Sequence, residues 1–401
     1  MIFFAYRKGH VGFAEVQGSS VPSIPNTGVL DAARDDALAA ARPPSRVLEF
    51  FAVGGLTPFL FPLSWLLRRA LGLDEAQLAV GFTFFYAAYV INDPHFAVTY
   101  LLFYKDVRAR ALGSAFPPSL RARYVIAGFL IPLILASWGI FAVVSRSPWV
   151  LGLLIQVMFF SVGWHYVKQG FGVMVVLAAR RGLRFSAWER LAILAHCFMG
   201  WAYAWASPYD PGREVEEKGV VYRTIAHPHG LERLMFVVFL ATLVPLAFVL
   251  VRKAIREKRL PIFTPLVAML SSVWAWSIYS SIDPLVVYVV PALHSVQYLY
   301  VVWLLKRNEG REREGPPWFE PSAKTRIGVL AVSAIGLGIL LFHVGPTALD
   351  DMLVTKKSAI TDMGPTPWFA ALYAFVNLHH YFMDNVIWRR DNPAMGYLRV
   401  P

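Results

Sequence analysis

Charge and cysteine are both scarce in this 401-residue sequence. Charged residues make up 16% of the chain and hydrophobic residues 57%, whereas an ordinary soluble domain carries about 25% charged residues. That scarcity excludes an ordinary soluble enzyme. The single cysteine, Cys197, excludes an intramolecular disulfide and says nothing about the redox compartment.

The apolar segments, in contrast, are long and continuous. A helix needs about 20 apolar residues to cross a bilayer, and a membrane β-barrel would show short alternating segments instead. The sequence therefore predicts an all-α protein, a polytopic integral membrane helical bundle with about ten transmembrane helices. The predicted spans are 48–72, 77–104, 123–145, 149–179, 188–207, 231–252, 262–281, 284–305, 326–344 and 366–388.

Positive charge is distributed unevenly over the connections between these spans. Basic connections alternate with short or acidic ones, apart from Arg68 and Arg69, which fall on a predicted outer turn. Because basic loops stay on the cytoplasmic side, this pattern predicts two cytoplasmic termini and explains the net charge of +12 without nucleic acid. The expected location is the cytoplasmic (inner) membrane of a bacterium. The basic connections are 105–122, 180–190, 252–260, 306–326 and the C-terminal tail.

The sequence predicts three regions. Residues 1–47 form a loosely ordered cytoplasmic extension with a short helix near 31–41, because they mix Ser, Pro, Asp, Arg and Ala and contain no signal-peptide pattern. Residues 48–390 form the transmembrane domain, and 391–401 form a cytoplasmic tail. The outer loop 208–230 contains His227 and His229, which are interpreted as surface residues.

Ionisable side chains inside a membrane are rare and mark functional sites, yet histidines recur here at one predicted depth. Each lies roughly 9 to 14 residues from the cytoplasmic end of its span, or about 14–21 Å along a helix. His196, in an oppositely directed span, falls near the same level. The histidines at this depth are His95, His165, His294 and the pair His379–His380.

Polar neighbours accompany these histidines at helical spacings of three and four residues. Imidazole is a good ligand for iron, copper and zinc, carboxylates suit harder ions, and a polar neighbour can fix the imidazole tautomer. The pattern predicts an intramembrane metal site. The four faces carry Asn92, His95 and Thr99; His165, Lys168 and Gln169; His294, Gln297 and Tyr298; and Asn377, His380 and Asp384.

Roles follow for individual residues of this site. The predicted ligands are His95, His165, His294 and His380, with His379 and His196 as additions. Alternatively, a lone histidine in a membrane helix forms a hydrogen bond to a neighbouring helix and binds no metal. Pro94 predicts a helix break that exposes Asp93, and Asp93 and Asp384 are ligands or orient them. Tyr298 donates a proton or an electron, and Lys168 balances charge by pairing with Asp384.

Two groups of membrane metalloenzymes share parts of this pattern. Di-iron hydroxylases and desaturases also use histidine clusters, but their H-x-x-x-H and H-x-x-H-H spacings are absent here. The pair His379–His380 and the spacing of His294 and Tyr298 resemble two details of haem-copper oxidases, whose H-x-H motif within a helix is also absent. No residue role is carried over from either group.

The preferred function is a metal-dependent oxidoreductase, such as an oxygenase, hydroxylase or desaturase. It would use iron, which the carboxylates favour over copper and zinc, to activate oxygen for a lipid-soluble substrate within the lipid bilayer, with a separate electron donor. One alternative is a transporter that moves protons or metal ions through the same residues. Another is a haem protein with two of these histidines as axial ligands.

Overall fold

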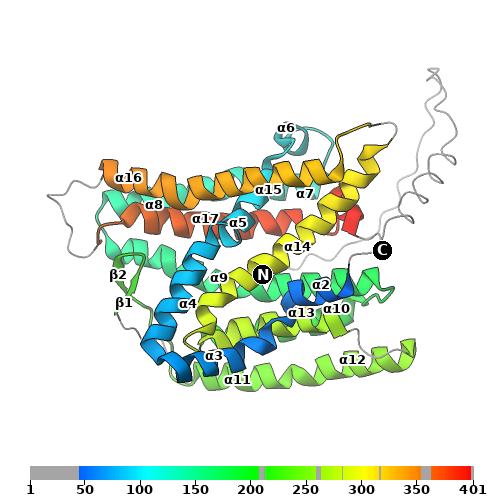
Figure 1. Ribbon diagram of the computed structural model, residues 1–401, viewed down its shortest axis with the longest axis horizontal. Helices are drawn as coiled ribbons and strands as arrows, with labels where there is room; N and C mark the ends of the chain where they lie inside the picture. The colour runs from blue at the N-terminus through cyan, green and yellow to red at the C-terminus, as the bar shows by residue number, and fades with distance from the viewer. Residues whose placement is uncertain are drawn as a thin grey trace. The chain divides into compact units, whose positions relative to one another are not determined.

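The protein is described here by a computed structural model that covers residues 45–206, 212, 214–258, 263–281, 283–315, 318–353 and 363–398. These residues are mostly helical, with a single β-hairpin, which confirms the predicted all-α class (Figure 1). The short helix expected near 31–41 lies outside them. The α-helices and strands are α2 (Arg46–Phe50), α3 (Thr57–Leu71), α4 (Leu73–Ala88), α5 (Asn92–Tyr104), α6 (Val107–Ala111), α7 (Pro118–Val125), α8 (Ile131–Val144), α9 (Pro148–Arg180), α10 (Ala187–Trp205), β1 (Glu214–Glu217), β2 (Val220–Arg223), α11 (Leu231–Ala241), α12 (Leu243–Glu257), α13 (Phe263–Leu270), α14 (Val286–Glu314), α15 (Ala323–Ile339), α16 (Gly345–Leu353) and α17 (Pro367–Ile387).

Several helices continue through short stretches of π-helix or 3₁₀-helix. The π-helical stretches join α2 to α3, α7 to α8, α13 to the segment after it, and α15 to α16. They are η1 (Phe51–Gly55), η2 (Ile126–Leu130), η3 (Ser271–Ile278) and η5 (Leu340–Val344), and the 3₁₀ turns are η4 (Tyr279–Ser281) and η6 (Pro393–Leu398).

Each of the ten predicted spans coincides with helical structure in the described residues. Within the described part of the chain, five continuous helical segments are long and apolar enough to cross a membrane, and a sixth, Arg46–Leu71, is bent by 58° at its middle. These segments identify a helical membrane protein; ten crossings and cytoplasmic termini stay predictions. The five are Pro118–Val144, Pro148–Arg180, Leu231–Glu257, Val286–Glu314 and Ala323–Leu353.

The predicted span 77–104 is broken, as Pro94 led us to expect. Helix α4 ends at Ala88 and α5 begins at Asn92, so the break lies slightly before the proline. Pro94 falls in the first turn of α5, where its missing N–H leaves no helical carbonyl without a partner. Because of this break, α5 begins at Asn92, and His95 lies in its first turn.

Helix α9 lies in the middle of the fold. It packs against α8 and α17 on one side and against α10 and α13 on the other (Figure 1). Its start is well defined, because the Ser147 side chain accepts a hydrogen bond from the Val150 amide at 3.3 Å and Pro148 occupies the first turn. Helices α5, α9, α14 and α17 bring the candidate site together.

The basic connections lie toward one end of the bundle. Helix α6 and the carboxyl ends of α12 and α14 lie toward the same end, whereas α16 and the β-hairpin lie toward the other (Figure 1). This arrangement agrees with the predicted alternation of basic and acidic connections. At the basic end, η6 packs back on α14, where the Asn308 side chain donates to the Tyr397 carbonyl at 2.8 Å. The described part of the predicted tail is therefore packed against the bundle.

The β-hairpin lies in the predicted outer loop 208–230. Strands β1 and β2 are antiparallel, and Lys218 and Gly219 at the turn between them have φ values of 53° and 79°. Two successive positive φ angles are typical of a type I′ hairpin turn. Tyr222 packs over Gly152 of α9, which anchors the hairpin on the bundle.

Candidate metal centre

Four histidines from four different helices meet in the interior of the bundle. They are His95 of α5, His165 of α9, His294 of α14 and His380 of α17, and none is more than 4% exposed. The ring centroids of His95 and His380 are 4.5 Å apart, and His165 lies 4.9 Å from His380. His294 borders them at 5.0 Å from His165. Spans far apart in the sequence thus place their predicted ligands together.

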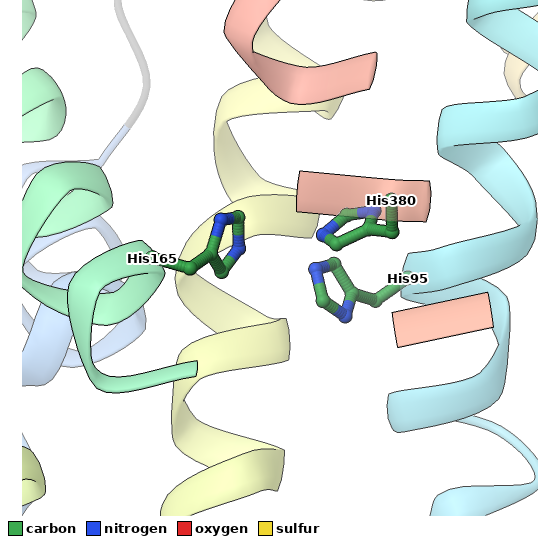
Figure 2. A group of neighbouring side chains, drawn as sticks. All are labelled: His95, His165 and His380. Atoms are coloured by element: carbon green, nitrogen blue, oxygen red, sulfur yellow. The ribbon is translucent and has the colours of Figure 1, made fainter. Parts of the chain in front are cut away.

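Three of these imidazoles have the geometry of an incomplete metal site. One nitrogen each of His95, His165 and His380 lies within 4.8 Å of the other two, and the three rings point toward one another (Figure 2). Metal–nitrogen bonds of about 2.0–2.1 Å hold two ligand nitrogens at most about 4 Å apart. The three nitrogens are therefore near the separation that ligands of one ion require.

The imidazole nitrogens of this cluster are not satisfied by the protein. His95 Nε2, His165 Nε2 and both nitrogens of His294 and His380 are buried without a hydrogen-bond partner among the described residues. A buried polar atom without a partner costs about 1–3 kcal/mol. Six such nitrogens in one place are costly unless something binds them, and a metal ion is a single ligand that can bind several at once.

Ser295 determines the tautomer of His95. The Ser295 hydroxyl lies 2.8 Å from the Pro291 carbonyl and 3.0 Å from the Asn92 side-chain oxygen, and both of these atoms only accept. When the hydroxyl proton goes to either of them, Ser295 Oγ accepts the Nδ1–H of His95 at 3.2 Å. This leaves the lone pair of His95 on Nε2, the nitrogen without a partner, as metal ligation requires.

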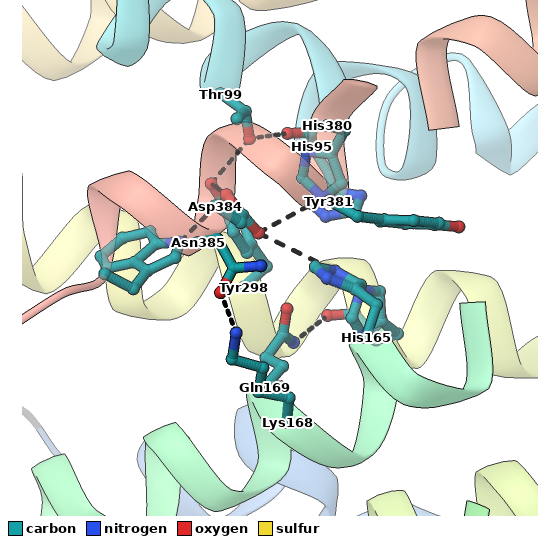
Figure 3. Close-up of polar contacts among 12 residues, drawn as sticks. His95, Thr99, His165, Lys168, Gln169, Tyr298, His380, Tyr381, Asp384 and Asn385 are labelled. Atoms are coloured by element: carbon teal, nitrogen blue, oxygen red, sulfur yellow. Dashed lines mark hydrogen bonds and ion pairs between the residues drawn. The ribbon is translucent and has the colours of Figure 1, made fainter. Parts of the chain in front are cut away.

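Asp384 places one carboxylate oxygen beside two of the histidines. Its Oδ1 accepts hydrogen bonds from the Tyr298 hydroxyl at 2.8 Å and from the Trp388 indole at 3.1 Å. Its Oδ2 lies 3.4 Å from His380 Nε2 and 3.8 Å from His165 Nε2 (Figure 3). Because Oδ1 is fixed by two donors, Oδ2 is the oxygen that can ligate an ion or orient a ligand.

Tyr298 also belongs to this site. Its ring centroid lies 4.6 Å from that of His95, and its hydroxyl is 2.6 Å from the Thr99 hydroxyl. The Thr99 hydroxyl also lies 3.3 Å from the His95 carbonyl, so its one proton has two acceptors, that carbonyl and the tyrosine oxygen. Thr99, Tyr298 and Asp384 form a buried chain of hydrogen bonds along one side of the histidines (Figure 3).

Lys168 lies close to the site but has a different partner from the one expected. Its ammonium group donates to the Asn385 side chain and sits 4.4 Å from the ring centre of Trp164. The structure thus replaces the expected ion pair with Asp384 by a contact to the next residue of α17. Gln169, one position on, donates to the His294 carbonyl at 3.1 Å and ties α9 to α14.

His379 and His196 point away from the cluster. His379 Nε2 donates to the Ala127 carbonyl at 3.0 Å and its Nδ1 accepts from the Tyr100 hydroxyl at 3.0 Å. His196 bonds Thr242 at 2.9 Å and accepts from the Trp274 indole at 3.3 Å. Both rings therefore have their two nitrogens occupied within the protein, and neither belongs to the centre that the other four histidines form.

Asp93 is also separate from the cluster. Its carboxylate pairs with His343 Nε2 at 2.8 Å, and the His343 ring stacks on Tyr89 with centroids 3.8 Å apart. The cause is the helix break at 89–91, which turns the first residues of α5 toward η5.

Two residues of the site were missed at the level of sequence. Trp388 lies four residues after Asp384, directly after the end of α17, and the same spacing rule that selected the other residues could have found it. Ser295 follows His294 directly and faces a different helix, so its role with His95 depends on the packing of α14 against α5. No family model, curated protein or solved structure matches this chain.

Proposed function

We propose that this protein is a membrane metalloenzyme in which His95, His165 and His380 bind one transition-metal ion, with His294 and Asp384 completing or orienting the ligand set. The observation that carries the proposal is the convergence of buried imidazole nitrogens that have no partner in the described protein. Their elements are held in place by the packing of α5, α9, α14 and α17.

Iron is the metal we favour. A carboxylate oxygen beside two imidazole nitrogens, at 3.4 and 3.8 Å, gives a mixed nitrogen and oxygen donor set, which suits iron(II) in oxygen chemistry. When bound, iron would supply the electrons and open coordination positions that oxygen activation needs. This makes an oxidoreductase of the oxygenase, hydroxylase or desaturase type our preferred assignment, with a lipid-soluble substrate and a separate electron donor.

The side chains around the ligands have roles of their own. Ser295 holds His95 in the tautomer that leaves Nε2 unprotonated, and Gln169 holds α14 against α9. Tyr298 can release its proton to Asp384, 2.8 Å away, and take one from Thr99, 2.6 Å away. Ser295, Thr99, Tyr298 and Asp384 are all buried in the bundle.

Of the two alternatives, haem binding fits less well. A porphyrin needs an open plane between its axial ligands, whereas the four imidazoles lie in contact and only His165 among them lines the neighbouring cavity. In the transporter alternative the same residues bind the ion, but the ion passes through the protein and does not stay bound. The experiment that tests the proposal therefore measures retention and movement of the metal.

The protein purified without oxygen and loaded with iron(II) should keep about one iron per chain after washing with a soluble chelator, and should then consume oxygen when an electron donor is added. Proteoliposomes loaded with the same protein should not move iron or protons down a gradient. Rapid loss of the metal to the chelator together with gradient-driven movement would show that the transporter alternative is right.

A further inference from the structure

A cavity of about 680 Å³ runs along α9 beside the candidate metal centre. One end is lined by His165, Tyr298 and Asp384, which are buried, and the other by Arg184 and Arg390, which are exposed. Lining residues of α9 extend from position 164 to 179, a rise of about 22 Å. The volume is within the range of about 300–1,000 Å³ that ligand pockets show.

The wall between the two ends is apolar. Val173, Val176 and Val301 line it, together with Met395 and Leu398 of η6. A small polar molecule gains nothing from such a surface, whereas an acyl or isoprenoid chain that enters from water is stabilised by about 0.8 kcal/mol for each methylene group that it buries. The shape and lining of the middle section therefore favour a chain.

Gly172 keeps the middle section open. An added Cβ at this position meets no atom within 4 Å, and the residue lies two turns along α9 from His165, among the lining residues. Glycine in the interior of a helix is less favourable than alanine by about 0.5–1 kcal/mol. No neighbouring atom requires a glycine at this position. The absence of a side chain on Gly172 instead leaves the middle of the cavity open.

The charges at the two ends differ. The described residues that line the cavity include four cations and a single carboxylate, Asp384, which lies at the buried end. At the exposed end Arg184 forms no hydrogen bond or ion pair with another described residue, and Arg190 uses one guanidinium nitrogen to donate to the Phe185 carbonyl at 2.9 Å. Arginine binds carboxylate and phosphate groups through paired hydrogen bonds.

We propose that this cavity binds a single-chain amphiphile with an anionic head group. The head group binds at Arg184 and Arg190, the chain lies along α9 past Gly172, and the far part of the chain lies next to His165 and Asp384. The reaction at the metal centre then falls on the chain and not on the head group. This assignment of substrate class rests on the proposed function, but the binding itself does not require the metal.

Native mass spectrometry of the full chain, released from a neutral detergent, tests the binding. Hexadecyl phosphate and palmitate should each bind with one molecule per chain, and hexadecanol should bind about tenfold more weakly. Replacing both Arg184→Ala and Arg190→Gln should weaken binding of the two anions about tenfold, the same factor that separates them from hexadecanol, and leave hexadecanol binding unchanged. Arg108→Ala, an exposed cation outside the cavity, is the matched control.

In Gly172→Leu the larger side chain fills the middle section of the cavity, and its Cβ meets no atom within 4 Å. It should abolish binding of all three probes while the metal content stays that of the parent. Conversely, His380→Ala should lose the metal and still bind hexadecyl phosphate, so a failure of the metal site and a failure of this proposal can be told apart. Equal binding of hexadecanol and hexadecyl phosphate, or normal binding to Gly172→Leu, would overturn the proposal.

Discussion

At the scale of single residues, the state of the imidazole nitrogens separates the histidines into two groups. Those of His379 and His196 are bonded within the protein, whereas His294 and His380 have no bonded nitrogen among the described residues. A buried histidine that is only structural has its hydrogen bonds made. His95 and His165 each have one nitrogen without a hydrogen-bond partner as well. These four histidines meet across four helices, and this is why we place the metal there.

Substitution of Asp384 tests the role of the carboxylate. The Asp384→Asn variant keeps a side-chain oxygen that accepts from Tyr298 and Trp388, so the fold should be retained, but it lacks the negative charge next to His165 and His380. We expect the affinity for iron to fall about 10–100-fold, measured by competition with a coloured chelator. An affinity equal to that of the parent would mean that the carboxylate plays no part in holding the metal.

Sequence spacing could predict which residues share a helix face, but not what each face meets. Steps of three and four residues brought His95 together with Thr99, and His380 with Asp384, and both pairs lie at the site. Asp93 was placed at the site on a different ground, the expected helix break at Pro94. Its partner His343 lies 250 positions away, and only packing brings the two together. The positions of Lys168 and Asp384 along their helices also suggested an ion pair, but Lys168 contacts the neighbouring residue, Asn385.

At the scale of the helices, small residues set how closely the helices around the site approach. An added Cβ on Gly170 of α9 would lie 2.4 Å from the Ser272 hydroxyl and 3.1 Å from the Ala268 carbonyl. On Gly338 of α15 it would lie 2.9 Å from the backbone of Asp93. Membrane helices use such residues to pack backbone against backbone. Gly170 lies five residues from His165, so this packing positions the ligand.

Gly170→Leu should therefore force α9 away from α13 and η3. Overpacking of this kind costs about 1–3 kcal/mol, which corresponds to a drop of about 2–10 °C in Tm, and the metal content should fall with it. Gly328→Leu is the control, because that glycine is exposed and an added Cβ meets nothing within 4 Å. Equal thermal unfolding of the two variants, followed by tryptophan fluorescence, would contradict the role given to Gly170.

The positions of helices were the part of the fold that the sequence predicted best. Long apolar runs have only one stable form in a bilayer, since every backbone N–H and C=O must be bonded within the segment. The break at 89–91 was predicted from Pro94, although a few residues too late. The π-helical stretches and the hairpin between α10 and α11 were not predicted, because they depend on packing and on a Lys-Gly turn rather than on hydropathy.

At the scale of the whole molecule, the basic connections are expected to lie on one side of the membrane. Reporter fusions after residues 115, 185, 256 and 315 should all report the cytoplasm, because positive loops are retained there. A fusion at the hairpin turn near Lys218 should report the opposite side. If any of the four basic sites reports the outside, the predicted spans do not alternate as proposed and the common depth of the histidines has to be abandoned.

The measurement that tests the central claim most directly is the metal content of single and double histidine variants, determined by mass spectrometry of the purified protein. If His95, His165 and His380 bind one ion, each alanine substitution should remove most of the metal, and any two together should remove little more, since ligands of one ion are not independent. His229 is exposed and lies between β2 and α11. The His229→Ala variant should therefore have the same metal content as the parent protein. Full metal retention in the three variants, or small losses that add, would show that no common centre exists.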